Sequence, residues 1–142
     1  MAGFIDSVKV FTDGGSRGNP GPGAIGVLIL DPQNNELDSL ASYIGHATNN
    51  QAEYRALIAG LDRAAAHTRG TVDCYLDSEL VVRQLQGRYR LKNPILRDLY
   101  HEVKNKERPF DRVTYTHVKR ENPNVKKVDA MLNHKMDEHL NP

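Results

Sequence analysis

Three acidic residues that lie far apart in the sequence could together hold a metal ion. Asp13 follows an apolar stretch and precedes two glycines, and Asp77 follows a second apolar stretch. Glu53 lies near the start of a helical pattern between them. Clustered carboxylates repel one another, so such a cluster is favourable mainly when a divalent cation neutralises it. Oxygen ligands favour Mg²⁺ or Mn²⁺ over metals that prefer sulfur or imidazole.

Each of these acids also has an ordinary structural interpretation when it is taken alone. Asp before Gly-Gly is a common turn residue, and Asp77 suits the start of a helix. Glu53 lies three residues after Asn50, which predicts a capping box with Asn50 as the cap. The joint placement favours the metal site, because the helix that carries Glu53 connects the two strands that end at Asp13 and Asp77.

The sequence lacks the residues that three other kinds of enzyme chemistry require. The six histidines include no His-x-x-x-His pair of the kind that binds zinc on a helix. Neither Ser16 nor Ser78 lies in a Gly-x-Ser-x-Gly elbow. The loop over 18–21 lacks the Gly-Lys-Ser/Thr ending of a nucleotide-binding P-loop.

The apolar spacing predicts the strands and helices that position the acids. Strands are expected over 8–12, 24–30, 37–44, 72–76 and 113–117, and helices over 50–70, 80–87, 94–108 and 128–140, with loops over 16–23 and 121–127. A right-handed crossover through the first helix makes the first and fourth strands parallel. If these strands are neighbours, Asp13 and Asp77 meet at one edge of the sheet, where α/β folds bind ligands.

Composition predicts one ordinary globular domain over residues 1–142. The chain is 39% hydrophobic and 26% charged, and its length suits a single core. The only cysteine, Cys74, favours a reducing, cytoplasmic location, and no apolar run approaches the roughly 20 residues that span a bilayer. The net charge of +1 alone does not indicate a nucleic-acid partner. Two local clusters are basic, and each is either a solvated loop or a binding patch: Arg88, Arg90 and Lys92; and Lys119, Arg120, Lys126 and Lys127.

Four segments resemble the motifs of type 1 ribonucleases H. The run over 12–23, Thr-Asp-Gly-Gly-Ser-Arg-Gly-Asn-Pro-Gly-Pro-Gly, resembles the opening motif of that family. The run over 47–53 resembles the second motif, and Leu76-Asp77-Ser78 with Leu80 and Val81 resembles the third. Val128-Asp129-Ala130-Met131-Leu132-Asn133 resembles the segment that carries a fourth acid at the start of the last helix. By this resemblance Asp129 is the fourth acid.

The resemblance implies an α/β fold and a two-metal nuclease. The fold is a five-stranded mixed sheet in the order 3-2-1-4-5, with strand 2 antiparallel and helices on its flanks. The implied activity is endonucleolytic hydrolysis of the RNA strand of RNA–DNA hybrids, leaving 5′-phosphate and 3′-hydroxyl ends. Two Mg²⁺ ions are expected, with Mn²⁺ as a substitute. Asp13 bridges both ions, Glu53 and Asp77 hold one, and Asp129 helps to hold the other.

The same resemblance implies a set of substrate contacts. Separately, no obligate protein partner is evident in the sequence, and a monomer is expected. Asn19, Asn49 and Asn50 are expected at the minor groove of the hybrid, where 2′-hydroxyls distinguish RNA from DNA. Their alternative is an ordinary role as loop and cap residues. Thr48 resembles the residue that binds a phosphate of the DNA strand. The remaining expected contacts are Gly14, Gly15 and Ser78.

The sequence departs from the family in three places, which indicates a compact member. The first strand begins within ten residues of Met1, so no preceding hybrid-binding module is expected, and the segment over 84–94 is too short for an extra helix with a basic protrusion. Arg88, Arg90 and Lys92 are expected to form a reduced version of that protrusion. The last loop lacks the mobile histidine that assists turnover in many members, and His117 and Glu121 are the candidates to replace it.

Two alternative functions keep the same fold. The first is a related two-metal nuclease that acts on DNA junctions or in DNA strand transfer. The second is a non-catalytic hybrid-binding module. The complete set of four acids argues against the second, because a surface that only binds a polyanion would favour the replacement of some of them.

Overall fold

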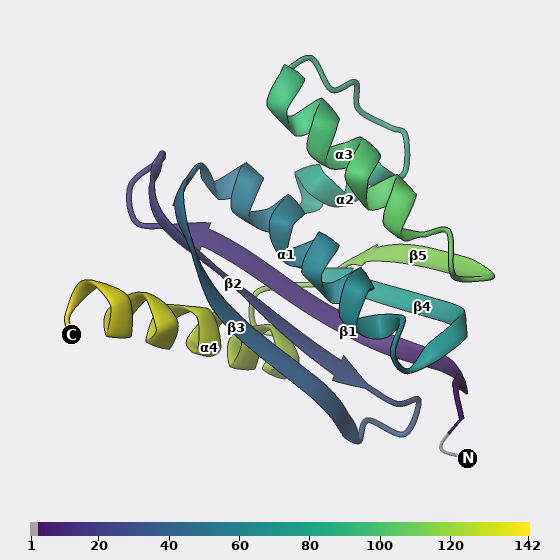
Figure 1. The fold of residues 1–142 in the computed structure, drawn as a ribbon. Helices are drawn as coiled ribbons and strands as arrows, with labels where there is room; N and C mark the ends of the chain where they lie inside the picture. The colour runs from purple at the N-terminus through teal and green to yellow at the C-terminus, as the bar shows by residue number, and fades with distance from the viewer. Residues whose placement is uncertain (1–2) are drawn as a thin grey trace.

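The computed structural model describes residues 3–142 as one five-stranded sheet and four helices (Figure 1). The strands are β1 (Ile5–Ser16), β2 (Gly21–Leu30), β3 (Glu36–Ala47), β4 (Thr68–Leu76) and β5 (Arg112–His117). The helices are α1 (Asn49–Ala64), α2 (Glu79–Leu85), α3 (Pro94–Lys106) and α4 (Pro123–Leu140). No helix in the described part of the chain is both long enough and apolar enough to cross a membrane.

The sheet has the predicted order, β3-β2-β1-β4-β5. β2 is antiparallel to both of its neighbours, β1 and β3. β4 is parallel to β1 and to β5, and α1 is part of the crossover that connects β3 to β4. The parallel neighbours β1 and β4 therefore bring Asp13 and Asp77 to the same end of the sheet, as predicted.

The two faces of the sheet are covered by different helices. Val8 and Val10 of β1 belong to the main core, which includes Leu57 and Leu61 of α1. Phe11 lies on the other face and packs with Val128 in a second core, which α4 covers. Successive residues of a strand alternate between faces, so Asp13, two residues after Phe11, also points to the α4 face. Figure 1 shows α4 on the opposite side of the sheet from α1 and α3.

The first strand and the second strand are longer than predicted. β1 continues through Gly14 and Gly15, and β2 begins at Gly21, because Gly15 pairs with Ala24 and Ser16 pairs with Gly23. Asp13 therefore lies within the strand and not at its exit. Glycine content predicted a loop here, but pairing between the two strands outweighs that local preference.

Two helix boundaries also differ from the prediction. α1 ends at Ala64 and not near Gly70, which instead lies in β4 against the backbone of Asp6. α4 begins at Pro123, where the side chain of Asn122 accepts hydrogen bonds from the first turn, so the predicted loop over 121–127 is largely helical. Asp129 consequently lies in the second turn of α4 and not at its start.

Candidate metal centre

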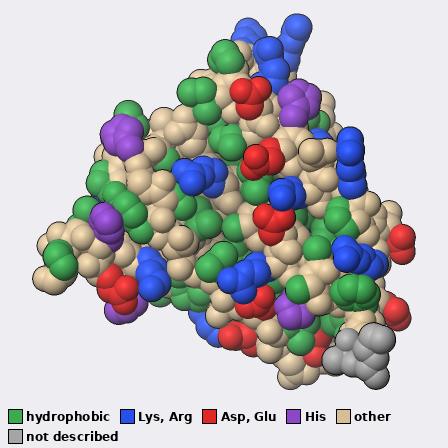
Figure 2. Space-filling view, viewed as in Figure 1, with side chains coloured by type: hydrophobic (Ala, Val, Ile, Leu, Met, Phe, Trp, Pro, Cys, Tyr) green, Lys and Arg blue, Asp and Glu red, His purple; other side chains and the backbone are tan. Residues whose placement is uncertain are grey.

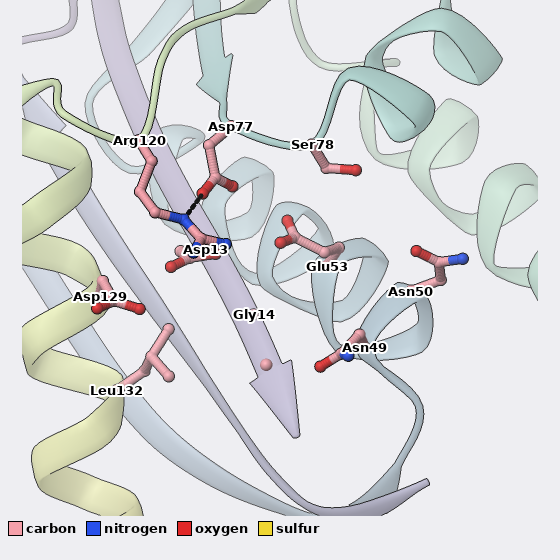
Figure 3. Close-up of a pocket in the computed structure, with 11 residues that line it drawn as sticks. Asp13, Gly14, Asn49, Asn50, Glu53, Asp77, Ser78, Arg120, Asp129 and Leu132 are labelled. Atoms are coloured by element: carbon pink, nitrogen blue, oxygen red, sulfur yellow. Dashed lines mark ion pairs between the residues drawn. The ribbon is translucent and has the colours of Figure 1, made fainter. Parts of the chain in front are cut away.

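Asp13, Glu53 and Asp77 converge at the end of the sheet, as the sequence predicts. One carboxylate oxygen from each residue lies within 4.8 Å of the others. Figure 3 shows Asp13 on β1, Asp77 just after β4, and Glu53 on α1 facing both. The pairing between β1 and β4 ends at Phe11 and Tyr75, so no partner strand lies on the β4 side of Asp13. This opening lets Glu53 reach Asp13 from the other face of the sheet.

Gly14 allows α1 to approach β1 closely enough for this contact. A Cβ atom at Gly14 would lie 2.7 Å from the backbone nitrogen of Glu53 and would collide with the carbonyl of Ala52. Real Cβ atoms essentially never come within 3.0 Å of a neighbouring atom. Gly14, which we predicted as a substrate contact, therefore has a packing role, although it also lines the cavity that contains the acids.

The start of α1 is fixed by a capping box that differs from the predicted one. Thr48 is the cap, and its hydroxyl oxygen accepts a hydrogen bond from the Gln51 backbone at 3.1 Å. Gln51 Oε1 accepts one from the Thr48 backbone at 3.0 Å. The prediction of Asn50 as the cap is wrong, and the Glu53 side chain is therefore free of a capping role and faces the other acids.

Two of the predicted substrate contacts connect the β1–β2 loop to α1. The Asn49 side-chain oxygen accepts a hydrogen bond from the Ser16 backbone at 2.9 Å. The Asn49 backbone donates to the side-chain oxygen of Asn19 at 3.0 Å. These bonds correspond to the ordinary structural role, and each amide group retains its NH₂ as a donor for another partner.

Burial and mutual repulsion perturb the protonation of the acids. Asp13 is 6% exposed, and its burial followed by the charge of Asp77 raises its pKa to about 7, against a smaller opposing effect of a hydrogen bond with Glu53. Burial and the charges of Asp13 and Asp77 raise the pKa of Glu53 well above its ordinary range. The hydrogen bond between them raises the pKa of Glu53 and lowers that of Asp13. The raised pKa of Glu53 favours its protonated form while the cluster holds no cation.

This cluster has the chemistry that a hard divalent cation requires. Its ligand atoms are carboxylate oxygens. Within residues 3–142, Glu53 Oε2 is buried and has no hydrogen-bond partner. A buried carboxylate oxygen without a partner is costly, and a cation would satisfy it while removing the repulsion among the acids. The residues present therefore fit a bound Mg²⁺ or Mn²⁺ ion.

Asp129 faces the same cavity from α4 (Figure 3). It is outside the group of three acids within 4.8 Å, but its charge contributes to the raised pKa of Asp13. The cavity has a volume of about 360 Å³. It is lined by Asp13, Gly14, Gly15, Asn49, Asn50, Glu53, Asp77, Ser78, Arg120, Asp129 and Leu132.

Arg120 is the charged residue in this cavity that the sequence reasoning did not single out. Its Nε atom lies 3.6 Å from Asp77 Oδ2, and 87% of its side chain is exposed. Of the two predicted replacements for the mobile histidine, His117 lies 3.8 Å from Glu79 beside a different cavity, and Glu121 is exposed and does not line the acid cavity. The feature of the sequence that could have pointed to Arg120 is the basic cluster that begins at Lys119, because Arg120 belongs to it.

The remaining predicted contacts lie outside the acid cluster itself. Ser78 lines the cavity and caps α2, where its hydroxyl oxygen accepts a hydrogen bond from the backbone of Val81. Arg88, Arg90 and Lys92 are exposed on the segment over 86–93 between α2 and α3, which contains no helix. Figure 2 shows Lys and Arg side chains gathered at the top of the view, above this segment.

The chain matches a known protein family and several solved structures. Residues 11–131 match the family described as reverse transcriptase-like. A bifunctional protein of Mycobacterium tuberculosis is 40% identical over 92% of this chain, and this chain spans 35% of its length. The ribonuclease HI of Halobacterium salinarum is 37% identical over 92% of this chain, which spans 65% of that relative.

Three solved structures share the fold at high similarity. The ribonuclease H1 of Halobacterium salinarum has a TM-score of 0.88 at 36% identity and covers 93% of this chain and 98% of its own. The N-terminal ribonuclease H domain of the Mycobacterium tuberculosis protein has a TM-score of 0.89 at 38% identity, and the match covers 96% of this chain and 97% of that domain. A ribonuclease H1 isolated from compost, solved in complex with an RNA/DNA hybrid, has a TM-score of 0.87 at 36% identity. That match covers 94% of this chain and 99% of the compost enzyme. By its family match, its relatives and its fold, the chain belongs to the type 1 ribonuclease H family.

Proposed function

We propose that this chain is an endonuclease that hydrolyses the RNA strand of RNA–DNA hybrids and leaves 5′-phosphate and 3′-hydroxyl ends. The observation that carries the proposal is the convergence of three carboxylates, two of them with raised pKa values, at one end of a ribonuclease H sheet. Further support comes from relatives that are named ribonuclease HI and from a similar structure solved with an RNA/DNA hybrid.

The four acids are proposed to hold two Mg²⁺ ions, for which Mn²⁺ would substitute. Asp13 would contact both ions, Glu53 and Asp77 would hold one, and Asp129 would help to hold the other. A bound pair of such ions supplies an activated water and stabilises the charge on the leaving 3′ oxygen. Because the pKa of Glu53 is raised, cation binding would displace a proton from its carboxyl group, so metal affinity should rise with pH.

Several polar groups near the acids are suited to bind the hybrid. The Thr48 hydroxyl accepts a hydrogen bond from Gln51, which leaves its own hydrogen for a phosphate at the start of α1. The NH₂ groups of Asn19, Asn49 and Asn50 are proposed to contact 2′-hydroxyls and base edges, which identify the RNA strand. Gly15 and Ser78 line the cavity and are proposed to contact the backbone of the substrate.

Arg120 is proposed to assist turnover in place of the missing mobile histidine. It fits this role better than His117 or Glu121, because its guanidinium group is exposed and lies beside Asp77 in the acid cavity. A guanidinium group binds phosphate oxygens through paired hydrogen bonds, so Arg120 would contact the substrate phosphate and aid its departure after cleavage.

The domain that carries this activity is proposed to be residues 1–142 acting as a monomer in the cytoplasm. The two cores that enclose the sheet support a single domain. The reducing location is supported by Cys74, which is free and fully buried. Light scattering of the purified chain at several concentrations would test the monomer, and a mass of twice 15.9 kDa would contradict it.

The direct test of the function is a cleavage assay with Mg²⁺ on four labelled substrates. These are an RNA–DNA hybrid, duplex DNA, duplex RNA and a four-way DNA junction. The native chain should cut the hybrid, Asp13→Asn should abolish cutting, and Asp98→Asn, an exposed acid on α3, should leave it unchanged. Cutting of the junction alone would favour the DNA nuclease, and hybrid binding without metal-dependent products would favour the binding module.

A further inference from the structure

Gly26 of β2 lies directly beside the central acid of the site. It pairs with Asp13 across the antiparallel β1–β2 ladder. Directly opposed residues of an antiparallel pair point to the same face of a sheet. A side chain at position 26 would therefore extend from the α4 face, next to the carboxylate of Asp13.

The space that this side chain would need is filled by α4. A Cβ atom at Gly26 would lie 2.8 Å from Cγ1 of Val128 and 2.8 Å from its carbonyl oxygen. Both distances are below the 3.0 Å that real Cβ atoms essentially never cross. Val128 is fully buried, and its carbonyl cannot turn away as a side chain can, so the helix itself would have to move.

The residue after Val128 is Asp129, which faces Asp13 across the cavity (Figure 3). We propose that Gly26 is a positioning residue of the metal centre. Because glycine has no side chain, position 26 lets α4 lie close against β1 and β2, and this close packing sets the distance between Asp129 and Asp13. Gly14 acts in the same way for α1 and Glu53 on the other face of the sheet. The inference rests on the proposed function, because it takes Asp129 to be a metal ligand.

Two other glycines differ from Gly26, one in how crowded it is and the other in how far it lies from the acids. A Cβ atom at Gly15, which also lines the cavity, would meet Leu132 Cδ1 at 3.9 Å, an ordinary contact. Gly70 is as crowded as Gly26, since a Cβ atom there would collide with the backbone carbonyl of Asp6. Gly70, however, lies near the start of β4, while Asp77 follows its end. Gly70→Ala is therefore a matched control that strains the backbone far from the acids.

The test compares Gly26→Ala, Asp129→Asn and Gly70→Ala with the native chain. Mg²⁺ is titrated into each metal-free protein, with binding followed by calorimetry and by the rise in Tm. Gly26→Ala should weaken Mg²⁺ binding by about tenfold or more, as loss of support for a metal ligand usually does. The Mg²⁺ concentration for half-maximal hybrid cleavage should rise in parallel, with a smaller change in KM for the hybrid. Gly70→Ala should lower Tm without changing the Mg²⁺ titration.

If Gly26→Ala does not fold, Val128→Ile provides a milder expansion of the same contact, with the same expected direction. Native Mg²⁺ binding in the position 26 and 128 variants, together with weakened binding in Asp129→Asn, would overturn this inference and leave the proposed function intact. Native binding in Asp129→Asn as well would remove the proposed role of Asp129, and the inference with it. A crystal structure of Gly26→Ala in which Asp129 keeps its distance from Asp13 would also overturn the inference.

Discussion

Asp13 and Glu53 are buried acids with raised pKa values, and these raised values control how the metal-free protein responds to pH. The pKa of Asp13 is about 7 in the native state and 3.8 in its ordinary environment. Between these values Asp13 makes the native state bind more protons than the unfolded state, so the free energy of unfolding should fall as pH rises from 3.8 to about 7. The raised pKa of Glu53 adds to this fall. A divalent cation would neutralise the carboxylates and reverse this loss.

Asp13→Asn should therefore stabilise the metal-free protein at pH 8. The expected gain is about 2 to 4 kcal/mol, because one pKa unit corresponds to about 1.4 kcal/mol. At pH 4 the gain should disappear, since the native carboxyl is then protonated. Urea unfolding in EDTA at both pH values measures this, with Asp98→Asn as the exposed control. Equal unfolding free energies for the native chain and Asp13→Asn at pH 8 would contradict the account.

Removal of the Arg120 charge should slow turnover more than it weakens binding. Arg120→Ala should lower kcat by about tenfold or more, while Arg120→Lys should retain an intermediate rate because it keeps the charge but not the paired hydrogen bonds. Steady-state kinetics on a labelled hybrid separate kcat from KM. Lys119→Ala, an exposed neighbour that does not line the cavity, serves as the control. Equal kcat values for all four proteins would exclude Arg120 from turnover.

The position at which helix α1 begins matters for the site, because the helix carries Glu53 near its start. Thr48 and Gln51 close the capping box at that start. Thr48→Ala should cost about 1 kcal/mol of stability through removal of the cap. Gln51→Ala removes the reciprocal bond but keeps the Thr48 hydroxyl, so it should lower stability without raising KM for the hybrid.

Comparison of these two variants separates capping from phosphate binding. Thr48→Ala should raise KM as well as lower stability, and Thr48→Ser should restore both properties, because it keeps the hydroxyl. Denaturant unfolding and steady-state kinetics provide the two readouts. An unchanged KM in Thr48→Ala would limit Thr48 to its structural role.

Local patterns in the sequence predict most of these elements but not all of their ends. Period-two alternation over 8–12 and 72–76 identifies the two central strands, and Pro94 marks the start of α3. The α1 cap was assigned wrongly because Asn50 and Thr48 are both good caps. The Thr48-x-x-Gln51 spacing is the signature that distinguishes them. The extension of β1 through Gly14 and Gly15 depends on pairing with β2, which glycine-rich sequence does not reveal.

The candidate site was predictable to the extent that topology fixes it. Two parallel strands and their crossover helix bring Asp13, Glu53 and Asp77 together, and this follows from element order alone. Asp129 came from the resemblance to a family motif. Arg120 could not be placed, because its position depends on the course of the loop between β5 and α4. The raised pKa of Glu53 could not be predicted from the sequence either, since it depends on the burial of the side chain.

The whole molecule is nearly neutral, yet its positive charge is concentrated in places. The net charge is +1, while Arg88, Arg90 and Lys92 are all exposed on the segment between α2 and α3. If this segment binds phosphates, replacing the three residues by Gln should raise KM and reduce its dependence on salt. The slope of log KM against log salt should fall by about one for each phosphate that the protein no longer neutralises. Kinetics between low and moderate salt concentrations measure this slope.

A control for this prediction uses basic residues elsewhere on the surface. Arg69 at the start of β4 and Arg108 after α3 are exposed. Replacing these two by Gln should leave both KM and its salt dependence nearly unchanged. Equal effects of the two sets of substitutions would mean that overall charge, and not the segment between α2 and α3, governs binding.

The central claim is that Asp13, Glu53 and Asp77 jointly hold a divalent ion. Anomalous diffraction from crystals soaked in Mn²⁺ tests it most directly. We predict an anomalous peak bounded by the three carboxylates at about 2.0 to 2.3 Å from their oxygens, absent in Asp13→Asn. Density that stays empty at saturating Mn²⁺ would contradict the claim.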